Sequence, residues 1–325
     1  MTGVNKKYLG LCFIGLIFGV ILIAVSCQKR GALPTLSAVS ISGLASAAPI
    51  ENATIREYSL NSDGSLGDLI SVTTTDSNGI YLLPQGASAT PVAIVLTKGT
   101  YAEEVGGRKI ALSSAEQLRV FLPSVSEGQD IGITPFTELA AARVLDLLGA
   151  GATDLAGTIS SANDLMAVAT GLTSITTSPD NIYQPISNPN SNAGIYALLL
   201  AGLSQFASTH SLASSLVALS AFSSDFHRDG YFNGSDNGSR VAFGGGAGSL
   251  ATNGWSTGLH AAVLAYASSS QGAASGFSAA QVPTLIDNPS APNACPSGTS
   301  ACGSNCVDLT SDDNNCGICG TALHR

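Results

Sequence analysis

The spacing of hydrophobic residues changes along the chain. A continuous apolar run covers residues 8–25, apolar and polar residues then alternate over much of 37–125, and a longer period begins after Thr134. Alternation with a period of two is typical of strands that bury one face, whereas apolar residues three and four positions apart share one face of a helix. The sequence therefore predicts an apolar leader, a β-rich region and an α-helical region, in that order.

Short predicted strands in the β-rich region are separated by clear turn signals. Ala53 and Ile55 lie on one face of the first long strand, and its register shifts at Tyr58. Asn, Asp and Gly gather at residues 61–65 and 76–79, and these residue types favour turns. Short strands with a turn about every ten residues favour a β-sandwich.

The helical region opens with a strong start signal. Thr134 is suited to cap a helix, and Pro135 is favoured in the first turn. Val144 and Leu148 would face the core, while Arg143 would lie in solvent on the opposite side. Further helices are predicted over residues 161–169, 194–207, 212–222 and 256–266, with polar loops over 177–192 and 225–253.

The apolar leader reads as a bacterial lipoprotein signal. Lys6 and Lys7 precede the apolar run, and the small residue Ser26 stands directly before Cys27. A positive start, an apolar stretch and a small residue before the cut are typical of secretory signals. Cys27 would be acylated and become the first mature residue, anchored by more than one chain. The alternative is an uncleaved transmembrane helix, because the run is close to the minimum length of a span.

The composition and net charge limit the classes of molecule that the protein is expected to bind. Charged residues make up 11% of the 325, and the net charge is −9. Nucleic-acid binding requires clustered Lys and Arg to meet the phosphates. We therefore expect no nucleic-acid partner.

Cysteines are concentrated at the C-terminal end. One lies in the leader and one at the predicted lipid site, and the region between Cys27 and Cys295 contains none. Crowded cysteines in an exported protein indicate a small disulfide module, whereas a metal site is the alternative for a C-x-x-C pair. The predicted disulfide residues are Cys295, Cys302, Cys306, Cys316 and Cys319.

A spaced motif lies within residues 40–83. It consists of Ser42-Gly43, Pro49-Ile50, Ala53-x-Ile55, Tyr58-Ser-Leu60 and the run from Thr75-Asp76 through Gly79 to Tyr81. This stretch resembles the carboxypeptidase regulatory-like, or prealbumin-like, β-sandwich of bacterial surface proteins. The resemblance implies an immunoglobulin-like sandwich, which is an accessory domain in the enzymes that gave it its name, so it implies no peptidase activity.

The C-terminal stretch 302–320 resembles a Cys-rich repeat of deltaproteobacterial surface proteins. Such repeats usually carry a further Cys at about the position where Leu323 stands. The five local cysteines are odd in number, so one is expected to stay unpaired. Truncation of the repeat would explain the missing partner.

One loop has the partial spacing of a calcium site. Asp225, Asp229 and Asp236 fall at positions 1, 5 and 12 of a calcium-binding loop, with Asn233 between them. His227 occupies position 3, where an oxygen ligand belongs. Ca²⁺ is thus the one candidate cofactor, and a polar loop after a helix is the alternative.

Catalytic motifs are not found in the sequence. The histidines do not form H-E-x-x-H, and no serine lies in G-x-S-x-G. Glu103 and Glu104 would point to opposite faces of a strand and so would not act together. His260 is expected at the surface, beside an apolar helix face. We therefore expect no enzyme activity.

These observations give an α+β multidomain protein. It is expected to be a lipid-anchored envelope protein, at the outer membrane, acting as a non-catalytic surface interaction or structural module. The alternatives are a calcium-stabilised adhesin or glycan-binding lipoprotein, and a hydrolase with an unrecognised site in the helical domain. The predicted segments are a signal peptide over 1–26, a tether over 27–36, a prealbumin-like β-sandwich over 37–125, an α-helical domain over 130–288 and a Cys-rich module over 294–325.

Replacing Cys27 by alanine tests the anchor. Without the thiol there is nothing to acylate, so Cys27→Ala should lose incorporation of radiolabelled palmitate and keep its uncleaved leader. Mass spectrometry of the N-terminus checks both expectations. A variant that is still cleaved normally and stays in the membrane fraction without lipid would contradict the lipoprotein interpretation.

Overall fold

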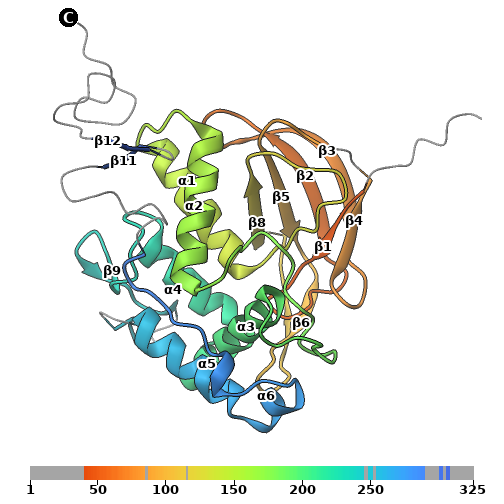
Figure 1. The fold of residues 1–325 in the computed structure, drawn as a ribbon, viewed down its shortest axis with the longest axis vertical. Helices are drawn as coiled ribbons and strands as arrows, with labels where there is room; N and C mark the ends of the chain where they lie inside the picture. Colours follow the sequence, from red (N-terminus) through yellow and green to blue (C-terminus); the bar gives the residue numbers. More distant parts are fainter. Residues whose placement is uncertain are drawn as a thin grey trace, which may run out of the picture. The chain divides into compact units, whose positions relative to one another are not determined.

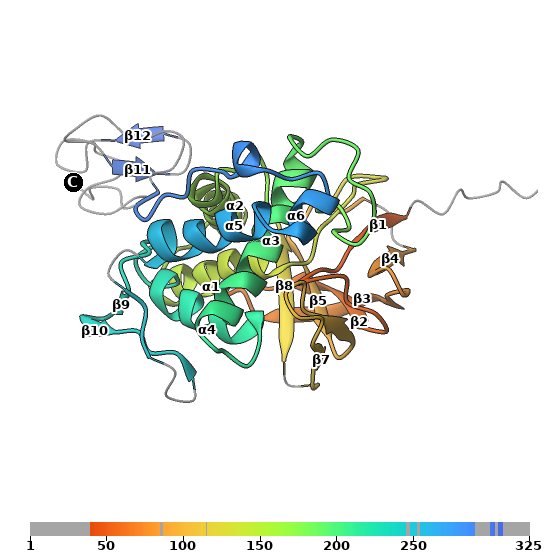
Figure 2. The same cartoon turned by 90° about the horizontal axis from the view of Figure 1, so that it is seen from below.

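The computed structural model describes residues 40–84, 87–114, 116–244, 248–251 and 254–289, and the backbone of 300–302 and 305–307. The described residues belong to one compact unit, Ala38–Arg325. Its fold is mixed α+β, as predicted. Both views show strands β1–β8 on one side of this unit and the main helices on the other (Figures 1 and 2). The predicted leader and Cys27 lie outside the described residues.

An antiparallel sheet with the strand order β3-β2-β5-β8 forms the centre of the β-rich region. Two further antiparallel pairs accompany it, β1 with β4 and β6 with β7. The strand bounds are β1 Ile41–Leu44, β2 Thr54–Leu60, β3 Leu66–Thr74, β4 Ile80–Leu83, β5 Val92–Thr97, β6 Thr100–Ala102, β7 Lys109–Ala111 and β8 Gln117–Leu122.

Local details of the first strands confirm the sequence analysis. The pairing of β2 with β3 shifts register on both sides of Tyr58, at the position where the alternation breaks. Gly79 has a φ of 76°, which a residue with a side chain rarely adopts, and it closes the predicted turn before β4. Ile55 and Tyr81 are buried.

Helix α1 (Pro135–Gly149) packs on one end of the sheet and leaves the other end open. Residues directly opposite each other in antiparallel strands share a face. Val72, Arg56, Val95 and Arg119 form one such row across β3, β2, β5 and β8. At the β8 end, Arg119 Nε donates to Glu138 of α1 at 2.9 Å. At the β3 end, Val72 is 49% exposed, so the helices cover only part of this face.

The predicted helices are present, most of them longer than expected. The fifth differs in kind, because its first turn is a π-helix, Gly254–Leu259, that continues into α5. The remaining bounds are α2 Leu155–Thr170, α3 Asn192–Thr209, α4 Ser215–Phe226, α5 His260–Ala267, α6 Ser270–Ala274, a 3₁₀-helix at Ala279–Gln281, and the short strands β9 Ser235–Asp236, β10 Ser239–Arg240, β11 Ser300–Cys302 and β12 Asn305–Val307.

Helix α1 begins as predicted. The Thr134 side chain accepts a hydrogen bond from the Thr137 N–H, and the Thr137 hydroxyl accepts one from the Thr134 N–H. This reciprocal pair satisfies two donors that have no partner within the helix. The prediction for Arg143 was wrong. Its guanidinium is largely buried and donates to the carbonyl oxygens of His227 and Arg228 after α4.

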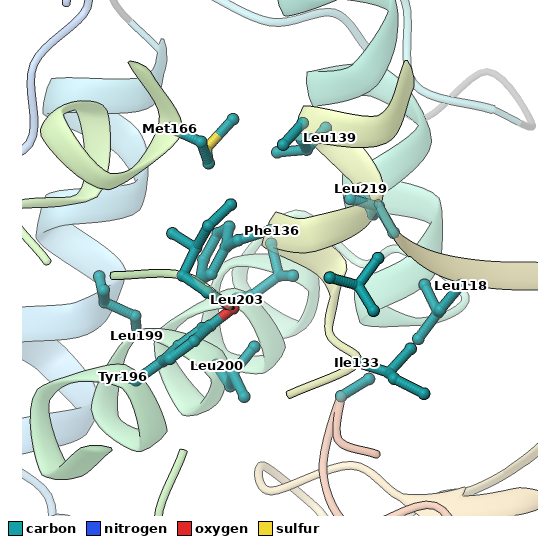
Figure 3. Packing of buried hydrophobic residues seen from close by; sticks show 14 of the residues in the cluster. Leu118, Ile133, Phe136, Leu139, Met166, Tyr196, Leu199, Leu200, Leu203 and Leu219 are labelled. Atoms are coloured by element: carbon teal, nitrogen blue, oxygen red, sulfur yellow. Dashed lines mark hydrogen bonds between the residues drawn. The ribbon is translucent and has the colours of Figure 1, made fainter. Parts of the chain in front are cut away.

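One apolar core joins the strands and the helices. A single cluster of buried side chains runs from Ile41 in β1 to Leu285 after the last helix. Figure 3 shows part of it, where Phe136 of α1 lies beside Tyr196 of α3. Trp255 stacks on Phe232 with 3.8 Å between the ring centroids and is fully buried. Since the core is continuous, the division into separate domains at residues 125–130 stays a prediction.

Two helical glycines give a matched test of this packing. A β-carbon on Gly202 of α3 would lie 2.3 Å from Val263 Cγ2 and 3.0 Å from the Val263 Cα of α5, whereas one on Gly149 would meet nothing within 4 Å. Gly202→Ala should therefore lower the free energy of unfolding by about 1–3 kcal/mol. Gly149→Ala should leave it unchanged or raise it by roughly 0.5–1 kcal/mol, because alanine is the better helix former. Urea unfolding followed by circular dichroism measures both, and equal effects would contradict the close contact.

Candidate functional site

Two adjacent acidic residues, Glu103 and Glu104, lie in the turn that follows β6. Glu103 and Glu104 are 3% and 6% exposed. They do not sit on a strand, so the expectation that they point to opposite strand faces was wrong. The β6–β7 hairpin brings the Glu103 carboxylate into contact with Ser215 of the helical region.

Glu103 caps helix α4 from outside that helix. Its Oε1 accepts hydrogen bonds from the Ser215 N–H at 2.8 Å, the Ser215 hydroxyl at 3.1 Å and the Tyr101 hydroxyl at 3.2 Å. Ser214, the N-cap residue of α4, makes no side-chain cap of its own. A carboxylate at a helix N-terminus is favoured by the helix dipole. Arg108, from the same hairpin, donates to the carbonyl oxygens of Leu212 and Ala213.

The surroundings of Glu104 differ from those of Glu103. Neither of its carboxylate oxygens has a hydrogen-bond partner among the described residues. Burial raises the pKa of Glu104 well above its usual value, and the neighbouring Glu103 carboxylate raises it further. Burial also raises the pKa of Tyr183, with a smaller contribution from Glu104. The protonated form of Glu104 is therefore favoured in the folded chain.

A small hollow is lined in part by residues of the same hairpin. Its volume is about 220 Å³, and it is formed by four segments that are far apart in the sequence. The ring of Tyr183 lines it, and this side chain is 52% exposed. We call it the Tyr183 pocket. Its principal polar lining residues are Glu51, Asn78, Lys109, Asn181 and Gln184.

Hydrogen bonds fix the lining of the Tyr183 pocket. The Tyr183 hydroxyl donates to the Ala102 carbonyl of β6 at 2.8 Å. Asn181 Oδ1 accepts from the Tyr183 N–H at 3.0 Å, and Glu51 Oε1 accepts from the Thr100 hydroxyl at 3.0 Å. The aromatic ring and the carboxylate are thus both tied to β6. The exposed side chains of Asn78, Lys109 and Gln184 complete the rim.

The predicted calcium loop uses its oxygens within the loop. Asp225 is buried and accepts from the Ser235 N–H at 3.1 Å, and burial raises the pKa of Asp225 to about 6. Asp229 accepts from the Tyr231 N–H and from Asn233 Nδ2. Asp236 accepts from Arg228 Nε at 2.8 Å. Within the described residues, no three His, Cys, Asp or Glu side chains gather as a metal site. Calcium binding stays a prediction.

Two clefts of about 560 and 570 Å³ offer less chemistry. The first lies beside β8 and α4, and both of its carboxylates already accept hydrogen bonds, Glu138 from Arg119 and Glu116 from the Ser113 N–H. The other, of about 570 Å³, lies beside α2, and its buried amide Asn163 donates to the Phe121 carbonyl. In both clefts a buried polar side chain already has a hydrogen-bond partner within the protein.

The other residues singled out in the sequence are His260 and the C-terminal cysteines. His260 is half-buried, with Nδ1 at 3.3 Å from the Pro283 carbonyl, rather than at the surface. Cys302 and Cys306 lie on the short antiparallel pair β11–β12, of which only the backbone is described. The remaining predicted disulfide residues lie outside the described residues: Cys295, Cys316 and Cys319.

Comparison with known proteins identifies no family. No protein-family model and no curated protein matches the sequence. A 9R-lipoxygenase from Cyanothece PCC8801 is similar over 38% of this chain and 24% of its own, with 12% identity and a TM-score of 0.16. In the described part of the chain, no helix is long and apolar enough to cross a membrane.

The Tyr183 pocket was not predicted from the sequence. Tyr183 stands within the predicted polar loop 177–192, and an isolated aromatic residue in a polar loop is the one local signal it carries. The other lining residues come from segments that only the folded chain brings together.

Replacing Glu104 by glutamine tests the buried carboxyl group. The pKa of this side chain is near 4.5 in the unfolded chain and well above that in the folded chain. Between those two values the folded chain binds more protons, so stability falls as pH rises. A glutamine side chain at position 104 stays neutral, so the free energy of unfolding of Glu104→Gln should match that of the wild type below about pH 4.5. At pH 7.5 it should be higher than that of the wild type, by up to about 1.4 kcal/mol for each pH unit between the unfolded-state and folded-state pKa of Glu104.

Urea unfolding at several pH values measures this difference. The exposed Glu127→Gln is the matched control and should follow the wild-type pH dependence. A Glu104→Gln variant with the wild-type pH dependence, or with lower stability at pH 7.5, would show that the carboxylate is stabilised by its surroundings.

Proposed function

We propose that the chain is a lipid-anchored cell-envelope protein, held at the outer membrane by Cys27, that acts as a non-catalytic surface interaction module. The proposed architecture is a prealbumin-like β-sandwich over residues 37–125, an α-helical domain over 130–288 and a disulfide-bonded tail from 294. The lipoprotein-type leader supports the location. The resemblance of residues 40–83 supports the sandwich.

The Tyr183 pocket is the observation that carries the binding role. It combines a partly exposed aromatic ring, whose position is fixed by a hydrogen bond to β6, with amide, carboxylate and ammonium groups at the rim. Concave sites with an aromatic wall and a few placed polar groups are typical of ligand binding. Segments from both the strand and the helical regions form it, so the whole fold positions the site.

Site-specific photo-cross-linking in cells tests this role. A photoreactive phenylalanine analogue at position 183 of the full chain should give a cross-linked product of higher mass. The same residue at position 231 is the matched control, because Tyr231 is also exposed, at 41%, and lies in another loop. Equal labelling at both positions, or none at position 183, would contradict a binding role for the pocket.

The anchor is tested in the same cells. Adding Cys27→Ala should leave the protein in the inner membrane, held by its uncleaved leader, and should reduce the cross-link at position 183 if the partner lies at the outer membrane. A variant in the inner membrane that cross-links as strongly would place the partner away from the outer membrane.

A further inference from the structure

We infer that the Tyr183 pocket binds a single saccharide ring, an inference that rests on the proposed binding role and names the class of ligand. The pocket brings an aromatic face together with hydrogen-bonding side chains in about 220 Å³. This volume is below the usual range for drug-sized ligands, so the occupant is of the size of one ring.

The aromatic wall suits the apolar face of a sugar. A pyranose presents a patch of C–H groups on one face, and such a patch packs against an aromatic ring. Tyr183 is 52% exposed and lines the hollow. Its hydroxyl is engaged with the Ala102 carbonyl, so the ring is held in place rather than free to rotate away. A ring that is already positioned loses little conformational freedom when the ligand binds.

The polar rim suits hydroxyl groups. Each sugar hydroxyl both donates and accepts a hydrogen bond. The amides of Asn78, Asn181 and Gln184 also offer donors and acceptors, the Glu51 carboxylate accepts, and Lys109 donates. Hydrogen-bond donors and acceptors therefore both lie around Tyr183, which suits a sugar ring that carries hydroxyl groups along its edge.

The backbone around Glu51 is also held rigidly. The Glu51 N–H donates to the Thr100 carbonyl at 2.8 Å, and the Thr100 N–H donates to the Glu51 carbonyl at 2.9 Å. Across the hollow, the Gln184 N–H donates to the Asn181 carbonyl at 2.9 Å, which closes a turn around Tyr183. Both sides of the pocket are therefore formed before a ligand arrives.

Other ligand classes fit the lining less well. A phosphate or nucleotide needs several cationic or N–H donors, and Lys109 is the one cationic side chain among the residues that line the hollow, where it is balanced by Glu51. An apolar ligand would leave the rim amides without partners. A peptide segment would need an extended groove, whereas this hollow is compact.

Ligand-observed NMR with simple sugars tests the inference. The probes are glucose, galactose, mannose and N-acetylglucosamine, added to the full lipidated chain in a detergent without a sugar head group. Saturation transfer from protein to probe reports binding. A single ring of this size supports a Kd of about millimolar, so the probes are used at roughly 10 mM.

We expect at least one probe to bind, and Tyr183→Ala to weaken that binding by about tenfold or more. Gln184→Ala, which removes an exposed rim amide, should weaken binding of the probe several-fold. This variant provides the test if Tyr183→Ala does not fold. Tyr231→Ala should bind as the wild type does. Circular dichroism melting curves confirm that each variant is folded.

Two results would overturn the inference. One is the absence of saturation transfer to all four probes, and the other is binding that persists in folded Tyr183→Ala and Gln184→Ala. The photo-cross-linking experiment separates this failure from failure of the proposed binding role. A cross-link from position 183 to a protein, together with no sugar binding, would keep the role and reject the saccharide.

Discussion

The Glu103 carboxylate connects the two structural regions of this protein. It belongs to the hairpin that extends from the strands, and it bonds to the first residue of helix α4. The adjacent Arg108 holds the carbonyl groups just before that helix. Because β6 also provides Thr100 and Ala102 to the Tyr183 pocket, the position of that pocket depends on how the hairpin docks. A charge-assisted contact of this kind is stronger than one between neutral groups.

Local signals in the sequence were sufficient for most of the secondary structure. Thr134 and Pro135 marked the start of α1, and the broken alternation at Tyr58 marked a register shift in β2. These features depend on residues that are close along the chain. The sequence likewise indicated the mixed α+β class, because strand-like and helix-like periods occupied different segments.

Contacts between residues that are far apart in the sequence could not be predicted from these local patterns. Arg143 looked like a surface residue because its helix position faces away from the apolar stripe, yet carbonyl oxygens of the chain after α4 accept hydrogen bonds from its guanidinium. Glu103 and Glu104 looked unremarkable because their burial depends on helices more than 90 residues away. The Tyr183 pocket has the same origin. Its parts lie in four segments, and no period or spacing relates them.

The π-helical turn at Gly254–Leu259 has a consequence for how tolerant this chain is to length changes. A π-helical turn holds one more residue than an α-helical turn. The wider turn takes up one residue, so deleting one residue there would restore a regular helix continuous with α5 and leave the preceding residue Trp255 close to its present position around the helix axis. Trp255 would then keep its place against Phe232 and Phe136. A one-residue deletion should therefore be tolerated better in this turn than in the regular helix α3, where no wide turn would take up the change of phase.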